Sequence, residues 1–279
     1  MRAGAVQLTA TADKAANLDG AARLVAEAAG QGADLIVLPE MFSCTGTGAE
    51  LRAGAELLEG ATAAWAAAIA AEHRVTLVAG TFIERLEGDD RLANTCTVWS
   101  PAGERLAVYR KVHLFDVDVP GAEYHESAVI LPGDEVVVAP TEPLPIGLSV
   151  CYDVRFPELY RIATLLGARL VTVPAAFTAK TGPPHWEVLL RARAIENQVF
   201  VVAAGQVGSS NDKLHWHGHS MIIDPWGTIV AEAGGADDDP DGKGSVIVAD
   251  LDLDAQEHTR GILPSLANRQ PDVYRWPAG

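Results

Sequence analysis

Three residues of reactive type stand where short apolar runs of the sequence end. Cys151 follows the run 145–150, Glu40 follows the run 33–39, and Lys111 follows the run 104–110. A thiol can attack a carbonyl carbon, a carboxylate can move the thiol proton, and an ammonium group can neutralise an oxyanion. These are the residue types that a thiol-dependent amide hydrolase needs, although sequence spacing alone does not prove that they meet.

Each of the three also has an ordinary structural explanation. Cys151 lies between a strand pattern and a helix pattern, where backbone N–H groups and a helix dipole favour a thiolate and an oxyanion. A lone cysteine in a strand, however, also packs as a small hydrophobe. Glu40 could cap local N–H groups, and Lys111 could be a surface charge, so position alone leaves the chemistry open.

The elements that must position these residues alternate along the chain without a linker. Apolar spacing predicts helices at 13–31, 60–73, 157–166 and 185–198, and a short helix before a proline-containing tail. Strands are predicted at 3–8, 33–39, 75–83, 94–100, 104–110, 135–139, 145–150, 169–174, 199–205, 218–224, 227–232 and 244–250. Residues 111–121 are too irregular for either. This order predicts an α/β fold in which two sheets lie between outer helices, within a single domain spanning 1–279.

The composition of the chain limits the classes of binding partner. The chain has 279 residues and a formal net charge of −16, which argues against nucleic acid or an anionic membrane as the main partner. Its three cysteines show no C-x-x-C spacing, so a reducing compartment fits best. The sequence opens on a strand pattern and has no apolar run of about 18 residues. We therefore expect a cytoplasmic protein without membrane contact.

Three segments carry a family resemblance. They are 38–42 (LPEMF), 109–114 (YRKVHL) and 151–158 (CYDVRFPE), and in this order they resemble the signature segments of the nitrilase superfamily of carbon–nitrogen hydrolases. The resemblance implies a four-layer α-β-β-α sandwich that hydrolyses a nonpeptide C–N bond through a thioester, with no metal and no organic cofactor. By match to the motifs, Glu40 is the general base, Lys111 the electrostatic stabiliser and Cys151 the nucleophile, and Glu126 is a second glutamate that positions the lysine.

Two further segments, 177–198 and 218–227, resemble the branch of small ω-amide hydrolases within this superfamily. That branch includes deaminated glutathione amidases and ω-amidases acting on α-ketoglutaramate, and residues 111–121 and 191–196 favour the former. The superfamily also includes N-carbamoyl amino-acid hydrolases and acyl transferases, so the sequence does not decide between water and an amine as acceptor. A catalytically silent scaffold with the same fold is the non-enzymatic alternative.

Substrates of this branch carry carboxylates, so a cation is expected in the pocket. Arg155 is the best candidate and Lys180 a weaker one, with Tyr152, Phe177 and Thr181 as further substrate-binding candidates. Alternatively, Arg155 could form an ion pair with Glu158 or Asp153 that fixes the turn. The resemblance also implies a homodimer, or a higher homo-oligomer, formed through the helix after Cys151 and the tail 263–276.

Two other segments could bind a metal. His215, His217 and His219 alternate and would share one face of a strand, as metal ligands can, but no carboxylate or cysteine motif accompanies them. The acidic run 237–241 reads as a solvated turn, with a metal-binding loop as the alternative. A serine amidase of the nucleophile-elbow type would need a G-x-S-x-G motif, and the sequence contains none.

Overall fold

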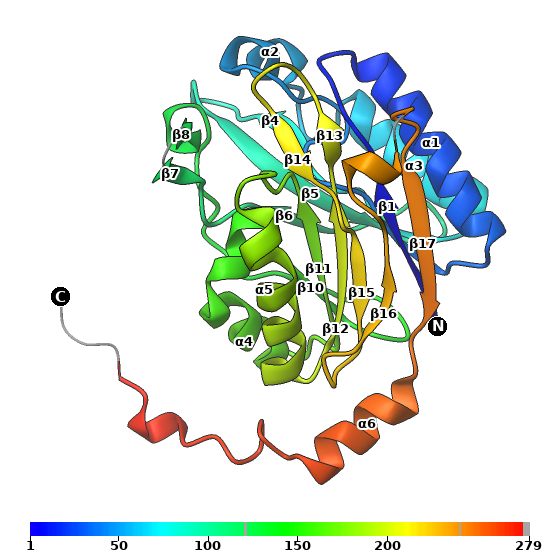
Figure 1. Ribbon diagram of the computed structural model, residues 1–279, viewed down its shortest axis with the longest axis vertical. Coiled ribbons are helices and arrows are strands. Elements are labelled where there is room, and N and C mark those ends of the chain that lie inside the picture. The colour runs from blue at the N-terminus through cyan, green and yellow to red at the C-terminus, as the bar shows by residue number, and fades with distance from the viewer. Residues whose placement is uncertain (120–121, 240, 276–279) are drawn as a thin grey trace.

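The computed structural model describes residues 1–119, 122–239 and 241–275. Its two main sheets pack face to face and are covered by helices on their outer faces (Figure 1). The first sheet contains β1 (Arg2–Gln7), β2 (Leu35–Val37), β3 (Thr76–Val78), β4 (Phe82–Arg85), β5 (Leu92–Trp99), β6 (Arg105–Arg110) and β17 (Ser245–Asp250). Its order is β17-β1-β2-β3-β5-β4, and β6 also pairs with β5.

The second sheet has the order β16-β15-β12-β11-β10-β9. Its strands are β9 (Val138–Ala139), β10 (Ile146–Leu148), β11 (Leu170–Ala175), β12 (Phe200–Gly205), β15 (Met221–Ile223) and β16 (Ile229–Glu232). Strands β10, β11 and β12 are parallel to one another, as are β1, β2 and β3 of the first sheet. Strand β12 packs against β1 and β2, so a continuous apolar core forms between the two sheets.

Helices α1 (Lys14–Gly30) and α3 (Ala61–His73) cover the first sheet, and α4 (Pro157–Leu165) and α5 (Gly182–Asn197) cover the second. In α1, Asp13 caps the first turn by accepting a hydrogen bond from the Ala16 N–H. Its buried residues Ala21, Leu24, Val25 and Ala28 form one apolar face. The predicted α-β-β-α sandwich is therefore confirmed, and none of the described helices has the length and hydropathy that crossing a membrane requires.

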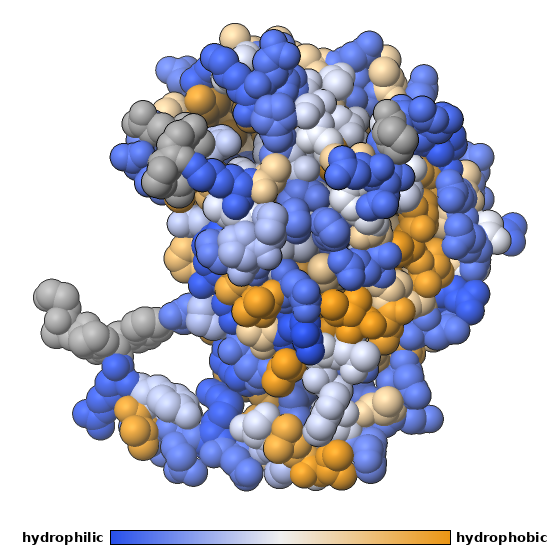
Figure 2. Space-filling model, viewed as in Figure 1, coloured by the Kyte–Doolittle hydropathy of each residue, from blue (hydrophilic) through white to orange (hydrophobic). Residues whose placement is uncertain are grey.

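After β17, helix α6 (Leu253–Ile262) and the segment that follows it run outside the body of the sandwich (Figure 1). Ile262, Leu263, Val273 and Tyr274 on this arm are exposed. Figure 2 shows hydrophobic residues on the outer surface of the same arm. Trp276, the last residue of the predicted dimer contact, lies outside the described residues.

The structure corrects three of the predicted elements. The strand predicted at 75–83 is divided into β3 and β4, both antiparallel to β5, because Gly80 turns the chain with φ +45°. A Cβ atom at Gly80 would lie 2.0 Å from the carbonyl oxygen of Pro39, so only glycine allows this approach to the segment that carries Glu40.

The segment 111–121 is not wholly irregular. Strands β7 (Asp116–Val119) and β8 (Ala122–His125) form an antiparallel pair, while residues 120–121 lie outside the described part of the chain. The strand predicted at 218–224 is shorter: β13 (Val207–Ser209) pairs with β14 (His215–His217), and the chain turns at Gly218 and His219, both with positive φ, before β15. A short helix α2 (Gly48–Gly54) was not predicted.

Candidate active site

The three reactive residues come from strand ends of both sheets. Glu40 lies in the turn after β2, Lys111 directly follows β6, and Cys151 lies beyond the end of β10. All three are buried and line one cavity. The packing of the two sheets thus brings together residues that are far apart in the sequence, as the family resemblance implies.

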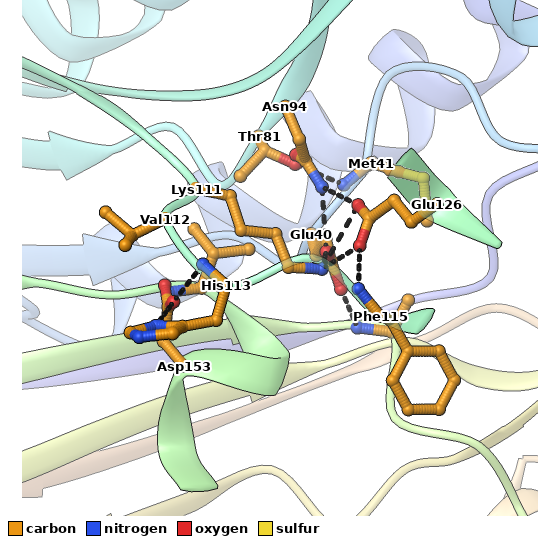
Figure 3. A network of polar contacts seen from close by, with 12 residues as sticks. Glu40, Met41, Thr81, Asn94, Lys111, Val112, His113, Phe115, Glu126 and Asp153 are labelled. Atoms are coloured by element: carbon orange, nitrogen blue, oxygen red, sulfur yellow. Dashed lines mark hydrogen bonds and ion pairs between the residues drawn. The ribbon is translucent and has the colours of Figure 1, made fainter. Parts of the chain in front are cut away.

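Lys111 lies between two carboxylates (Figure 3). Its Nζ donates to Glu40 Oε1 at 2.9 Å and to Glu126 Oε2 at 2.8 Å, and it lies 3.2 Å from Glu126 Oε1. The side chains of Lys111 and Glu40 are each 2% exposed. Glu126 also accepts a hydrogen bond from the Phe115 N–H at 2.7 Å, which ties the start of the β7–β8 segment to the lysine.

The Glu40 carboxylate is fixed at both oxygens. Oε1 accepts from Lys111 and from the Asn94 amide at 2.8 Å, and Oε2 accepts from the Ala176 N–H at 2.8 Å. The adjacent turn is strained at Met41, whose φ is +52°. Thr81 Oγ1 accepts from the Met41 N–H at 2.8 Å (Figure 3), and Gln206 Nε2 donates to the Glu40 carbonyl at 2.8 Å.

Cys151 has a φ of +48°, an uncommon conformation for a residue other than glycine that marks functional turns. It begins a 3₁₀ turn, Cys151–Arg155, that leads into α4. Buried Asp153 holds this turn by accepting from the Val150 N–H at 2.8 Å and the Tyr109 hydroxyl at 2.7 Å. Its other oxygen accepts from the His113 N–H at 3.0 Å. Asp153 therefore connects the turn at Cys151 to the segment that carries Lys111.

The charges around the cavity set the protonation of the lysine and the thiol. Burial works to lower the pKa of Lys111, but the carboxylates of Glu126 and Glu40 outweigh burial and hold that pKa well above its usual value. Burial and the Glu40 carboxylate raise the pKa of the Cys151 thiol well above its usual value, despite the opposing effect of Lys111. These pKa directions favour an ammonium at Lys111 and a protonated thiol at Cys151. The position of Cys151 between a strand and a helix predicts an environment that favours the thiolate, whereas burial beside the Glu40 carboxylate acts in the opposite direction.

The cavity has a volume of about 300 Å³. Glu40, Lys111, Glu126 and Cys151 lie together at one part of its wall. The rest of the wall is largely apolar and aromatic, and comes from Met41, Leu51, Ile83, Phe115, Tyr124, Val129, Ile130, Tyr152, Phe177, Leu214 and Trp216, with Thr45, His125, Thr178 and Thr181 as polar members. This is the form of a small-molecule site in which few polar groups fix the ligand's orientation.

Three of the four predicted substrate-binding residues, Tyr152, Phe177 and Thr181, line this cavity. Arg155 does not. Its guanidinium carbon lies 5.6 Å from the centre of the Tyr152 ring and 5.3 Å from that of Phe177. Its terminal nitrogens lie 3.3 Å from His185 Nδ1. The structure thus pairs Arg155 with His185 and two ring faces, and not with Glu158 or Asp153, the alternative partners predicted from the sequence.

The histidines weighed as metal ligands are arranged differently from the prediction. His219 lies beyond the end of β14, with φ +55°, and its ring stacks on His217 with centroids 4.5 Å apart. His215 Nδ1 lies 2.6 Å from the Ser209 hydroxyl. Across 1–119, 122–239 and 241–275, no cluster of three or more His, Cys, Asp or Glu residues has the arrangement of a metal site.

The site contains groups that sequence reasoning missed, above all Asn94, Asp153 and the Ala176 N–H. Asn94 carries an amide in a fully buried strand whose other residues are apolar or threonine. That contrast is the one sequence signal that could have drawn attention to it. The role of a backbone N–H such as that of Ala176 depends on the packing of the two sheets and leaves no signal in the sequence.

A buried thiol, a carboxylate and an ammonium in one cavity, on two facing sheets between helices, define a class of thiol-dependent hydrolase. Comparison with known families agrees: residues 2–260 match the model of the carbon–nitrogen hydrolase family. The chain belongs to this family, whose members hydrolyse C–N bonds, and its fold is that of the nitrilase superfamily.

Named relatives match almost the whole chain. A deaminated glutathione amidase from Synechocystis sp. is 43% identical over 271 residues, covering 96% of this chain and 97% of the relative. Omega-amidase NIT2 from Danio rerio is 39% identical over 275 residues, covering 98% and 96%. The crystal structure of Nit3 from Saccharomyces cerevisiae, a member of branch 10 of the nitrilase superfamily, superposes with a TM-score of 0.86 at 32% identity and covers 97% of this chain and 96% of Nit3.

A further solved structure concerns the cysteine itself. A variant of the amidase from Nesterenkonia sp. AN1 contains acrylamide joined by Michael addition to its active-site cysteine. That protein is 30% identical to this chain, with a TM-score of 0.75, and the match covers 96% of this chain and 99% of the amidase.

Proposed function

We propose that this protein is a cysteine amidase that hydrolyses a small carboxylate-bearing amide through a thioester, with deaminated glutathione as the leading substrate. The single observation that carries the proposal is the contact of Lys111 with Glu40 inside the cavity that Cys151 lines. Glu40 is the general base, Lys111 stabilises the oxyanion, Cys151 is the nucleophile, and Glu126 positions the lysine.

In the first half-reaction, the Cys151 sulfur attacks the amide carbonyl carbon while its proton passes to Glu40. The carbonyl oxygen becomes an oxyanion, which the Lys111 ammonium neutralises. Glu40 then gives the proton to the amide nitrogen, the C–N bond breaks, and ammonia leaves a thioester on Cys151. Because burial and the Glu40 carboxylate raise the pKa of the Cys151 thiol, proton transfer and attack belong to the same step.

In the second half-reaction, water attacks the thioester carbonyl as Glu40 removes a proton from the water. The C–S bond breaks, the thiol is restored, and the carboxylic acid leaves. The cavity has the size of a small acyl group, and Arg155 lies against the rings of Tyr152 and Phe177 and not on the cavity wall. An ω-amidase acting on α-ketoglutaramate-type amides is the second candidate, supported by the NIT2 relative.

We further propose a homodimer in the cytoplasm. The exposed apolar residues Ile162 and Leu165 on α4 and Leu166 directly after it, together with those on the C-terminal arm, support the dimer contact that the resemblance implies. Cys44, Cys96 and Cys151 are all free, which supports a reducing compartment.

The test is ammonia release from deaminated glutathione, α-ketoglutaramate, a plain aliphatic amide and an N-carbamoyl amino acid, with wild type and Cys151→Ala. We expect turnover of one of the first two substrates, abolished in the variant. Equal turnover by Cys151→Ala would overturn the mechanism. Preference for the N-carbamoyl amino acid would overturn the substrate assignment, and selective labelling of Cys151 without turnover of any of the four would favour an amine acceptor.

A further inference from the structure

The amide of Asn94 joins the two carboxylates of the site. Its Nδ2 donates to Glu40 Oε1 at 2.8 Å and to Glu126 Oε1 at 3.3 Å (Figure 3). The backbone carbonyl oxygen of Asn94 accepts a hydrogen bond from the backbone N–H of Lys111 at 2.9 Å. Asn94 therefore contacts the base, the second glutamate and the backbone of the lysine at the same time, from a strand that is hydrogen-bonded on both sides.

The orientation of this amide is set by its neighbours. A primary amide has two N–H hydrogens, and here one points to each carboxylate. If the amide were turned over, its oxygen would face two carboxylate oxygens. Within the described part of the chain, Asn94 Oδ1 has no hydrogen-bond partner, and the residue is 1% exposed. Asn94 Oδ1 is thus a buried acceptor without a hydrogen bond, while Nδ2 donates to two carboxylates. Buried polar atoms are normally hydrogen-bonded, so this arrangement needs an explanation.

The explanation lies in the balance of charge. The buried carboxylate of Glu40 and the partly buried carboxylate of Glu126 share the one ammonium of Lys111, so the cluster carries an excess negative charge. The neighbouring ionisable groups are Cys151 and His125 on the cavity wall, Asp116 on β7, and the Glu84–Arg110 ion pair that Thr95 contacts from β5. Arg110 is bound to Glu84 through both Nε and a terminal nitrogen, so its charge is already matched.

We propose that Asn94 is a positioning residue that keeps Glu40 and Glu126 ionised together by uncharged donors, and so sets the lowest pH at which Cys151 can react. The inference rests on the proposed role of Glu40 as the base. Donors that bind the charged form of a carboxylate favour that form. Without them, the excess negative charge is relieved by binding a proton at higher pH, and a protonated Glu40 cannot accept the thiol proton.

The test measures the rate at which acrylamide alkylates Cys151 as a function of pH, followed by mass spectrometry of the Cys151 peptide. Asn94→Leu keeps the branching at Cγ and removes both donors, and Asn94→Ala serves the same purpose if the leucine variant does not fold. The free energy of a hydrogen bond to a charged group corresponds to a change of about one to two pH units in the protonation of that group. We expect the acid limb of the profile, in which the rate falls as the pH falls, to move to higher pH by about that amount in either variant.

Gln206→Met is the matched control. It removes an amide that donates to the backbone carbonyl of Glu40 at 2.8 Å and not to its carboxylate, so its acid limb should coincide with that of wild type even if the protein is less stable. Glu40→Gln separates the inference from the proposed function. If Glu40→Gln leaves the profile unchanged, Glu40 is not the base and the proposed mechanism fails. If Glu40→Gln abolishes the acid limb while a folded Asn94→Leu or Asn94→Ala keeps it at the wild-type pH, the mechanism stands and the role of Asn94 is refuted.

Discussion

Replacing Asp153 by asparagine should loosen the turn that carries Cys151. The Asp153 side chain is completely buried. One oxygen accepts from the Tyr109 hydroxyl and the Val150 N–H, at 2.7 and 2.8 Å. The other accepts from the His113 N–H at 3.0 Å and lies 2.7 Å from His113 Nδ1. Asparagine has the same shape but must place an N–H₂ group where one of these oxygens stands.

Either orientation of the asparagine leaves one backbone donor facing another donor. If the N–H₂ group faces Tyr109, the phenol can turn to accept from it, but the Val150 N–H cannot. If it faces His113, an unprotonated Nδ1 can accept, but the His113 N–H cannot. One buried hydrogen bond to a charged group is lost, at about 1.5–3 kcal/mol, and an unpaired buried N–H costs about 1–3 kcal/mol more. We expect Asp153→Asn to lower the free energy of unfolding by about 3–5 kcal/mol, which is a large part of the stability of a typical protein.

The assay is thermal unfolding followed by circular dichroism, together with kcat at a temperature where the variant is folded. A loss of about 3–5 kcal/mol corresponds to a fall in Tm of about 6–10 °C at this chain length. The control is Asp224→Asn, because one oxygen of Asp224 accepts both the Trp226 and Thr228 N–H groups, at 2.9 and 2.8 Å, and an amide oxygen can do the same. A Tm for Asp153→Asn equal to that of the control would refute the reasoning.

Three further changes test other parts of the molecule. Lys111→Met should lower kcat at least about 10²-fold, since one group that stabilises the oxyanion is lost; a folded variant with near-normal turnover would contradict the role of the lysine. Burial, and secondarily the neighbouring His219, lower the pKa of His217 from 6.5 to about 4. Because only the unfolded chain then binds a proton at His217 in that interval, the protein loses stability as the pH falls from 6.5 towards 4. The free energy of unfolding of His217→Gln, measured by denaturant titration, should therefore fall less across this range than that of wild type. Arg155→Ala should raise KM for neutral and anionic amides by the same factor, because its guanidinium supports the Tyr152 and Phe177 rings; a selective loss for anionic amides would show instead that it reaches the substrate.

The order of helices and strands follows from the sequence because long apolar patterns dominate it. The exceptions are short elements whose signals are local. The α2 helix begins with a capping box, in which Thr47 and Glu50 bond each other's backbone N–H groups, and this Thr-x-x-Glu spacing is legible in the sequence. Strand β7 follows an alternation of aspartate and valine at 116–119, which is a strand pattern too short to stand out without its partner β8.

The site divides in the same way. Residues that act from strand ends, such as Glu40, Lys111 and Cys151, can be located from the pattern of the strands that carry them, and the motif resemblance assigns their roles. The directions of side chains cannot be located in this way, because they depend on packing between distant segments. Arg155 is near Cys151 in the sequence, but its stacking on Phe177 and its contact with His185 turn it behind the cavity wall.

Asn94 shows that a residue whose contacts depend on packing also matters for the chemistry. The sequence identifies two glutamates and a lysine by type but does not show that they share one site. The structure places all three in one cluster with one negative charge in excess, where the uncharged amide of Asn94 contacts both carboxylates. A second cation at that position would add a charge to the cluster and compete with Lys111 for the Glu40 carboxylate. An amide holds the carboxylate in place without adding a charge, and that arrangement depends on the contacts of one side chain in β5.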